Sequence, residues 1–316
     1  MRWPTPLSAF RQAELSVAEK AQQISLGLVL LIVAIGCVGF AMLYSANKSL
    51  EPWALRQMIR FAIGIVIMFA VVMVDIRVWL KHAYSIYAIT FLLLLYVEVA
   101  GEIGMGAQRW IDLKFIQLQP SEIMKVALVL ALARFFHRLA SEDIGRPTSL
   151  IVPILLVMAP TALVLAQPDL GTAAMLLMVG AAMFFVAGVR LWKFAVVALA
   201  AVAAFPMAWD HLRDYQKARI LTFLNPENDP QGAGYHILQS MIAFGSGGVF
   251  GKGYLQGTQS HLNFLPERQT DFIFTMLAEE FGMIGGLLLL GLYTMIFIYG
   301  FAIAFSCRNH FGRMLA

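Results

Sequence analysis

Long apolar runs alternate with short polar segments along almost the whole chain. The runs reach about 20 residues, the length of helix that crosses a hydrocarbon core of about 30 Å. Backbone groups in lipid must be bonded within the segment, and the runs are too long and too uniformly apolar for barrel strands, so helices are predicted. The eight predicted spans are residues 24–44, 58–74, 83–99, 121–136, 149–166, 170–189, 191–208 and 272–305.

Composition supports this pattern, because 60% of the residues are hydrophobic and only 13% are charged. The predicted fold class is all-α, a polytopic integral membrane protein with a large extracytoplasmic loop that contains short helices. The amino-terminal segment has prolines and charges but no short apolar core with a cleavage site, so it is interpreted as a tail and not a signal peptide. The predicted parts are a cytoplasmic tail (1–23), spans one to seven (24–209), the large loop (210–270), span eight (271–305) and a cytoplasmic end (306–316).

Charge distribution predicts the orientation. With the amino terminus inside, the cytoplasmic segments hold twelve Lys and Arg residues against five Asp and Glu residues, which agrees with the positive-inside rule. The basic pI of about 9.1 therefore reflects inner-face loops and gives no reason to invoke nucleic acid. The two cysteines, Cys37 inside the first span and Cys307 beyond the last, offer no disulfide or metal-ligand spacing.

Three spans are predicted to begin at the outer face, and each opens with polar residues: 119–125, 167–172 and 270–271. Ser121 and Thr270 are interpreted first as helix caps. Glu122 and Lys125 have the spacing of a helical ion pair, so a structural pair and a substrate contact both remain open. Asp169 is either a cap or a functional carboxylate. For Asp271, beside a long apolar run, a functional role is favoured.

Helix amino termini that converge on one pocket would suit an anion. Several basic residues in the predicted outer loops oppose the usual charge bias, and among them Arg109 beside Trp110, and Arg268 close to Asp271, are the preferred candidates. Guanidinium groups match phosphate oxygens. Outside the cytoplasm, a lipid-linked sugar presents such a diphosphate at the membrane surface, which narrows the predicted substrate class.

The glycine-rich run 244–253 fits neither phosphate-binding loop pattern, so a turn that allows close approach to a neighbouring helix or a lipid head group is predicted instead. Residues 235–244 before it are predicted to form a short half-apolar helix. The last span, at 34 residues, would extend about 51 Å, so we expect it to project outward or to bend near Gly282, Gly285 and Gly286.

Seven short strings, in this order, carry a family resemblance: Gly-Ala-Gln-Arg-Trp-Ile at 106–111, Gln-Pro-Ser-Glu at 119–122, Gln-Pro-Asp-Leu-Gly-Thr at 167–172, Gly-Tyr-His at 234–236, Gln-Ser at 239–240, Gly-Ser-Gly-Gly at 245–248 and Pro-Glu-Arg-Gln-Thr-Asp-Phe-Ile-Phe at 266–274. From about residue 24 onward the chain resembles the SEDS (shape, elongation, division, sporulation) family of bacterial cell-wall polymerases. The Gly-Lys-Gly and Pro-Glu-Arg forms are similar to its elongation branch.

The resemblance implies a peptidoglycan glycosyltransferase of the bacterial inner membrane that polymerises lipid II at the outer face. It assigns the role of general base to Asp271. The candidate substrate-binding residues are Arg109, Trp110, Glu122, Lys125, Asp169, Arg219, Glu267 and Arg268. A divalent cation, Mg²⁺ or Mn²⁺, is a further candidate for charge stabilisation, without assigned ligands. The implied partners are a class B penicillin-binding protein and other membrane proteins of the elongation complex.

Two departures from the family pattern stand out. Family members usually have ten spans, so the last two helices are expected to be absent here, and Gln269 stands where the family commonly has histidine. Two other functions therefore remain open beside the polymerase. One is a flippase or transporter for lipid-linked sugar, and the other is an inactive truncated scaffold for a penicillin-binding protein.

Overall fold

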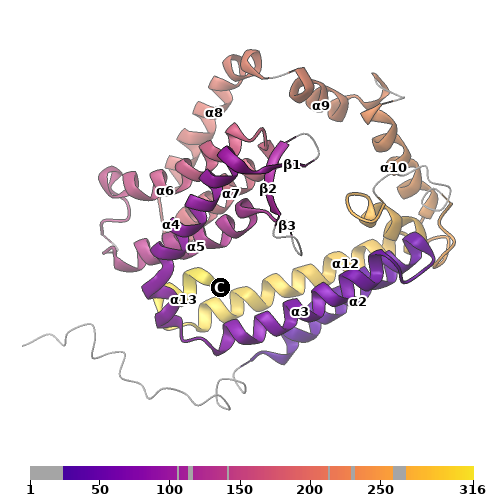
Figure 1. Cartoon of the computed structure of the whole chain (residues 1–316), viewed down its shortest axis with the longest axis horizontal. Helices are drawn as coiled ribbons and strands as arrows, with labels where there is room; N and C mark the ends of the chain where they lie inside the picture. Colours follow the sequence, from indigo (N-terminus) through magenta and orange to yellow (C-terminus); the bar gives the residue numbers. More distant parts are fainter. Residues whose placement is uncertain are drawn as a thin grey trace, which may run out of the picture. The chain divides into compact units, whose positions relative to one another are not determined.

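The computed structural model describes residues 24–104, 107–112, 117–140, 142–212, 214–228, 232–258 and 268–316 (Figure 1). They fold mainly as helices, with one small sheet. The elements are α2 (Leu26–Asn47), α3 (Trp53–Met73), α4 (Ile76–Ala100), β1 (Glu102–Gly104), β2 (Ala107–Asp112), β3 (Gln117–Leu118), α5 (Pro120–Arg138), α6 (Pro147–Ala166), α7 (Leu170–Ala187), α8 (Leu191–His211), α9 (Asp214–Leu224), the 3₁₀ helix η2 (Pro226–Asn228), α10 (Ala233–Gly247), α12 (Ile273–Ser306) and α13 (His310–Leu315).

Among the described residues, six helices are long and apolar enough to cross a membrane: α2, α3, α4, α6, α7 and α12. The protein is therefore a multi-pass helical membrane protein, as predicted. Of the other two predicted spans, α5 carries charged residues at both ends, and the apolar part of α8, Leu191–Met207, is shorter. The predicted short helices of the large loop are present as α9 and α10.

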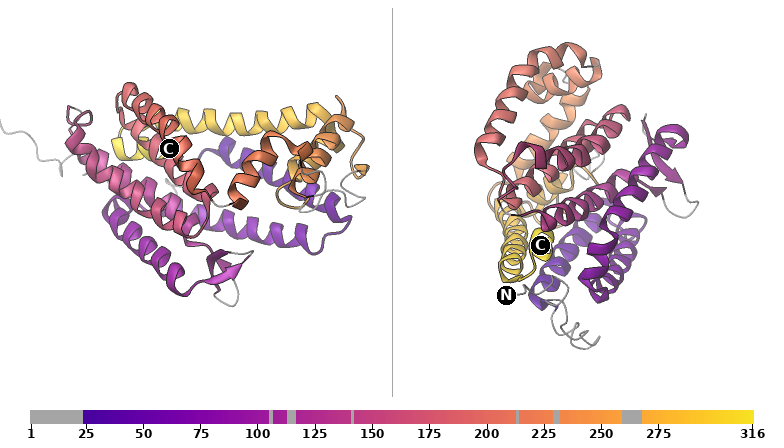
Figure 2. Two further views of the ribbon diagram at one scale, coloured as in Figure 1. Left: turned by 90° about the horizontal axis from the view of Figure 1, so that it is seen from above. Right: turned by 90° about the vertical axis from the view of Figure 1, so that its left-hand side faces the viewer.

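The chain divides into two compact units, one formed by residues 1–74 and 211–299 and the other by residues 75–210 and 300–316. In the first unit, α2, α3 and the first part of α12 lie side by side (Figures 1 and 2). Met42 and Ala46 of α2 pack against Met276 and Leu277 of α12. Small residues let these helices approach closely, since a Cβ at Gly36 would collide with the ring of Phe61.

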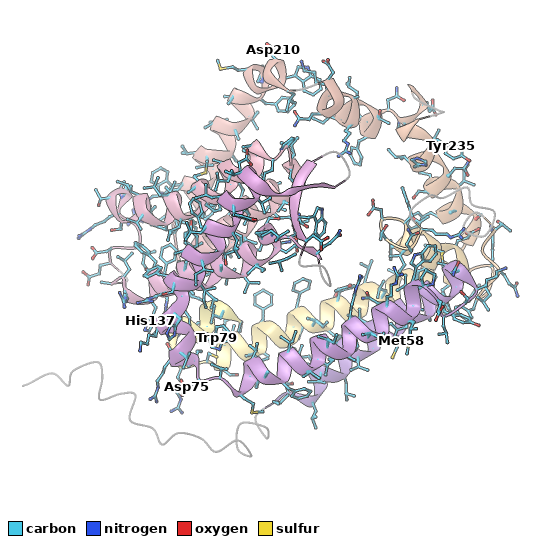
Figure 3. The ribbon with its side chains drawn as sticks, in the orientation of Figure 1. Met58, Asp75, Trp79, His137, Asp210 and Tyr235 are labelled. Atoms are coloured by element: carbon cyan, nitrogen blue, oxygen red, sulfur yellow. The ribbon has the colours of Figure 1, made fainter. Side chains whose placement is uncertain are left out.

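The second unit is built around α5, which is the most enclosed helix. Its buried face includes Met124, Leu128, Leu132 and Phe136, and it is covered by α4, α6, α7 and α13. Asp75, which is labelled in Figure 3, caps α4 by accepting a hydrogen bond from the Arg77 N–H at 2.8 Å. Because most of α5 is covered by its neighbours and its charged residues lie toward its two ends, its polar residues do not conflict with a place inside a membrane protein.

A three-stranded antiparallel sheet, in the order β1-β2-β3, connects α4 to α5. The sequence analysis predicted only helices and did not anticipate these strands. Trp110 of β2 pairs with Glu102 of β1, and Ile111 pairs with Leu118 of β3. β3 leads almost directly into Pro120, and β2 contacts α5. The sheet therefore places the strand of Trp110 beside the polar start of α5.

Candidate functional site

Asp271, the predicted general base, lies in the turn that leads into α12. Its side chain is exposed, while Arg268 and Gln269 in the same turn are half-buried. Glu267, another predicted residue, lies outside the described residues. The placement agrees with the sequence prediction in one respect, because Asp271 stands at a helix start where a carboxylate can meet a ligand from solvent.

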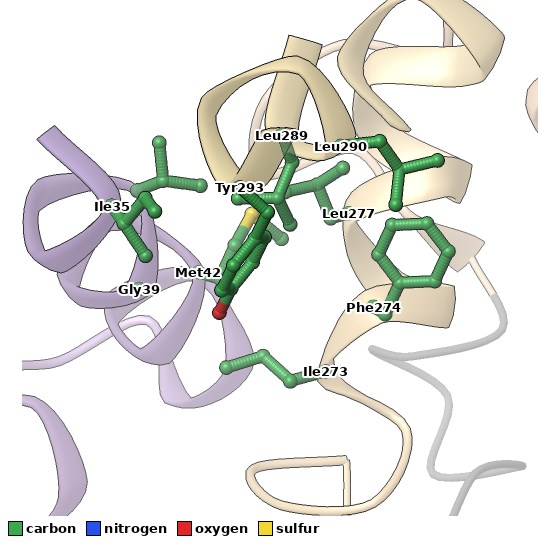
Figure 4. Close-up of a pocket in the computed structure, with 10 residues that line it drawn as sticks. Ile35, Gly39, Met42, Ile273, Phe274, Leu277, Leu289, Leu290 and Tyr293 are labelled. Atoms are coloured by element: carbon green, nitrogen blue, oxygen red, sulfur yellow. The ribbon is translucent and has the colours of Figure 1, made fainter. Parts of the chain in front are cut away.

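Two apolar cavities open beside the start of α12. One, of about 350 Å³, lies between α2 and α12 and is lined by Ile35, Met42, Ile273, Phe274 and Tyr293 among others (Figure 4). A second, of about 410 Å³, extends to α3 and includes Gln269, two residues before Asp271. The exposed Asp271 side chain and an apolar surface are therefore both found at the start of α12.

Helix α10 lies against the first turns of α12, and Tyr235 near its start is labelled in Figure 3. Ser240 and Thr275 share a hydroxyl hydrogen bond of 3.0 Å, and the rings of Phe244 and Phe274 are 5.7 Å apart. A Cβ at Gly247 would collide with the Ala278 carbonyl oxygen. The close approach predicted for the glycine-rich run is thus confirmed.

Helix α12 is not continuous. Gly282 has φ 67° and ψ −163°, so the helical hydrogen-bond pattern is interrupted there, at one of the three glycines where a bend was predicted. The segment after α10 supplies the missing partners. Four backbone bonds cross the break: Lys252 N to Glu279 O (3.0 Å), Gly253 N to Glu280 O (2.9 Å), Met283 N to Gly248 O (2.9 Å) and Ile284 N to Val249 O (3.2 Å). The glycine-rich segment is therefore part of the support of α12.

Two glutamates just before this break are fully buried. Glu279 accepts hydrogen bonds from the Lys252 ammonium at 2.7 Å and from both the N–H and the hydroxyl of Thr258, at 2.8 and 3.1 Å. The Lys252 ammonium also donates to the Thr258 hydroxyl at 2.6 Å. Glu280 accepts from the Ser45 hydroxyl of α2. We call Lys252, Thr258 and Glu279 the Lys252 knot.

Tyr254 joins the same segment to α2, since its hydroxyl donates to the Ala41 carbonyl at 2.9 Å. Burial, followed by the nearby Glu280 carboxylate and the Tyr44 ring, raises the pKa of Tyr254 above its ordinary value. The phenol therefore stays protonated and keeps its role as a donor at neutral pH.

Neither Lys252 nor Glu279 was assigned a partner from the sequence. A signal was available, because a carboxylate inside a predicted span requires a nearby cation or donor. The sequence distance of 27 residues between the two partners hid the pairing.

In the second unit, Glu122 and Lys125 form the predicted ion pair, with 2.8 Å between Oε2 and Nζ. The glutamate side chain is 55% exposed and the lysine 23%. The Lys125 ammonium also contacts the Met175 sulfur of α7 at 3.8 Å. Since Lys125 and Met175 are each five residues beyond the start of their helix, the amino termini of α5 and α7 lie at the same end of this unit, as predicted.

Asp169 is the amino-terminal cap of α7. Its carboxylate accepts from the Thr172 N–H at 3.1 Å and from the Thr172 hydroxyl at 2.9 Å. The capping interpretation, which the sequence left open, is therefore confirmed, and a substrate role for this residue stays a prediction.

For the remaining predicted residues the structure gives mainly their place in the fold. Trp110 is half-buried on β2, beside Arg109 on the same strand. Arg219 is exposed on α9 of the first unit. Within the described part of the chain, no group of three or more His, Cys, Asp or Glu side chains is arranged to hold a metal ion.

Comparison with known proteins identifies the class. A model of the cell cycle protein family of FtsW, RodA and SpoVE matches residues 20–316, so the chain belongs to this family. It is 43% identical to the peptidoglycan glycosyltransferase MrdB of Escherichia coli over 92% of this chain and 78% of that protein. It is 32% identical to the peptidoglycan glycosyltransferase RodA of Treponema pallidum, over 92% and 84% of the two chains.

Solved structures agree. A chain from a study of how a peptidoglycan synthase complex coordinates polymerization and crosslinking matches with a TM-score of 0.77 and 33% identity, covering 93% of this chain and 82% of that one. RodA of Thermus thermophilus matches with a TM-score of 0.66 and 29% identity, covering 93% and 79%. The predicted family is confirmed, and the relatives carry the enzyme name that the sequence predicted.

Proposed function

We propose that this chain is a peptidoglycan glycosyltransferase that polymerises lipid II at the outer face of the cytoplasmic membrane during cell elongation. Its family membership supports the reaction class. The observation that carries the site is the exposed carboxylate of Asp271 at the start of α12, next to an apolar cavity.

In the proposed reaction, Asp271 takes the proton from the 4-hydroxyl of the acceptor sugar as that oxygen attacks the anomeric carbon of the donor. The bond between that carbon and the diphosphate oxygen breaks, and the lipid diphosphate leaves with the electron pair. Negative charge on the leaving group needs cationic stabilisation, for which Arg109, Lys125, Arg219 and Arg268 are the proposed donors. Trp110, Glu122, Asp169 and Glu267 complete the proposed substrate-binding set.

The apolar surroundings of Asp271 suit a donor that is anchored by a lipid chain. Ile273 and Phe274 lie two and three residues after Asp271, and both line the cavity between α2 and α12. A lipid-linked sugar can place its chain against this surface while its diphosphate and sugars stay at the polar end of the helix.

We further propose that the amino terminus is cytoplasmic, that a class B penicillin-binding protein is the partner, and that other elongation-complex membrane proteins bind nearby. The charge distribution of the loops supports the orientation. The structural match to a chain from a complex that couples polymerization to crosslinking supports the partner class.

Polymerisation of lipid II by the purified protein tests the proposal. We expect wild type to make long glycan and Asp271→Asn to lose at least about 100-fold in rate, the contribution of a general base. Glu142→Gln, the same carboxyl-to-amide change at an exposed residue of the predicted inner face, serves as the matched control and keeps full activity. Since Asp271 is exposed, the melting temperature of Asp271→Asn should equal that of wild type.

Three outcomes contradict the proposal. Undiminished polymerisation by Asp271→Asn removes the general-base role. Wild-type protein that makes no glycan but moves a labelled lipid-linked sugar across vesicles is a flippase, and protein that does neither but still binds a penicillin-binding protein is a scaffold.

A further inference from the structure

We propose that the Lys252 knot positions Asp271, by holding the first part of α12 in one register against the segment that follows α10. The inference rests on the proposed role of Asp271 as general base. It assigns a positioning role to Lys252, Thr258 and Glu279, none of which is proposed to touch the substrate.

The break at Gly282 makes such a device necessary. Residues 273–281 form a short helical segment that is separated from the long remainder of α12 by a non-helical residue. A segment of nine residues is too short to be stable on its own helical hydrogen bonds, so its position depends on the groups packed around it. Asp271 lies two residues before this segment, so its placement depends on where the segment is held.

Apolar packing alone does not set the register of the segment. Met276 and Leu277 lie against Met42 and Ala46 of α2, and such contacts tolerate small sliding or rotation because they are non-directional. The Lys252–Glu279 bond is directional and charge-assisted, and Thr258 adds two more donors to the same carboxylate. The knot therefore adds to the four backbone bonds across the break and helps to select one of the registers that the apolar contacts accept about equally.

The position of Glu279 separates this role from direct catalysis. From Ile273 to Glu279 the helix advances about 9 Å, so Glu279 lies well below the helix start. Its side chain is fully buried and its carboxylate is engaged by Lys252 and Thr258. It can influence the reaction only through the placement of the segment, and a shift of about 1 Å in a reacting group can cost about 100-fold in rate.

The test separates positioning from stability with paired neutralisation in the full chain. Lys252→Met leaves the buried Glu279 carboxylate without its cation, and Glu279→Gln leaves the partly exposed Lys252 ammonium without its counter-charge. The double variant Lys252→Met/Glu279→Gln removes both charges while it keeps an acceptor for Thr258. For each, kcat and KM on lipid II and the melting temperature are measured, beside Asp271→Asn. Arg146→Met, which breaks an exposed ion pair with Asp143 of similar length (2.7 Å), is the matched control.

We expect both single variants to melt at lower temperature and to lose about ten- to 100-fold in kcat, with KM changed less than about threefold. In the double variant the melting temperature should return toward wild type while kcat stays at least about tenfold low. Arg146→Met should resemble wild type. If the single variants do not fold, the double variant and Thr258→Val, which removes only a hydroxyl, provide the same comparison of kcat with melting temperature.

The proposal is overturned if the double variant recovers kcat together with its melting temperature, because the pair then only avoids a stranded charge. It is equally overturned if folded Lys252→Met turns over at the wild-type rate. Failure of the Asp271 proposal has a different signature, namely an active Asp271→Asn, so the two inferences can fail separately.

Discussion

Two Glu–Lys ion pairs in the described part of the chain have nearly equal length but carboxylates in opposite surroundings. Glu122 and Lys125 in the second unit are 2.8 Å apart and three residues apart in sequence, with the glutamate 55% exposed. Glu279 and Lys252 in the first unit are 2.7 Å apart and 27 residues apart, with the glutamate fully buried. The same two groups serve different purposes because their surroundings differ.

A pair whose carboxylate is exposed contributes little, about 0.2–1 kcal/mol, because water screens that carboxylate. Either residue can therefore leave its partner and bind a substrate at a low cost in free energy. A fully buried carboxylate loses its hydration on folding, and removal of its cation leaves a stranded charge that costs about 3–5 kcal/mol. A charge that binds a substrate is therefore expected in an exposed pair, and a charge that holds a geometry is expected in a buried pair.

The largest loss of stability is expected at Gly251, the residue before Lys252 of the buried pair. Gly251 has φ 82°, and a Cβ there would collide with the Glu280 carbonyl oxygen and with the backbone around Gly282. No rotamer change relieves a clash with backbone. Gly251→Ala should therefore destabilise the protein by about 4 kcal/mol or more, the upper end for a single substitution, as measured by thermal unfolding in detergent.

Gly291→Ala is the control for this prediction, since it adds the same methyl group to α12 where nothing lies within 4 Å. It should leave the melting temperature unchanged or raise it slightly, because alanine is the better helix former. An unaltered melting temperature for Gly251→Ala would mean that the segment after α10 does not lie against α12.

A smaller loss of stability is expected at Asp169, the cap of α7. Asp169→Ala should cost about 1 kcal/mol by loss of the cap, and Asp169→Asn much less, because asparagine caps nearly as well. Thermal unfolding checks both. If Asp169→Asn keeps its melting temperature and loses polymerisation, the carboxylate charge serves the substrate as well as the helix, and equal activity would restrict Asp169 to capping.

The same contrast explains how much the sequence could predict. Apolar runs located the helices. Local spacing offered the Glu122–Lys125 pair and the Asp169 cap as one of two interpretations each, because these features depend on neighbours in the chain. The strands around Trp110 were missed, since three short strands of two to six residues leave little periodicity. The partner of Glu279 could not be found from spacing, because the pairing depends on how the segment after α10 folds onto α12.

The smallest effect on stability is expected at the exposed Glu122–Lys125 pair. The polymerisation rate of a Lys125 variant shows whether this pair binds the substrate. Lys125→Met should lower the free energy of unfolding by no more than about 1 kcal/mol. If the ammonium binds the diphosphate, loss of one charge-assisted hydrogen bond, about 1.5–3 kcal/mol, should reduce polymerisation by roughly 10- to 150-fold. Measurement of the rate and the melting temperature on the same samples separates the two. Wild-type polymerisation by Lys125→Met would make Glu122 and Lys125 a plain surface ion pair, and only the buried pair would then retain a proposed part in the reaction.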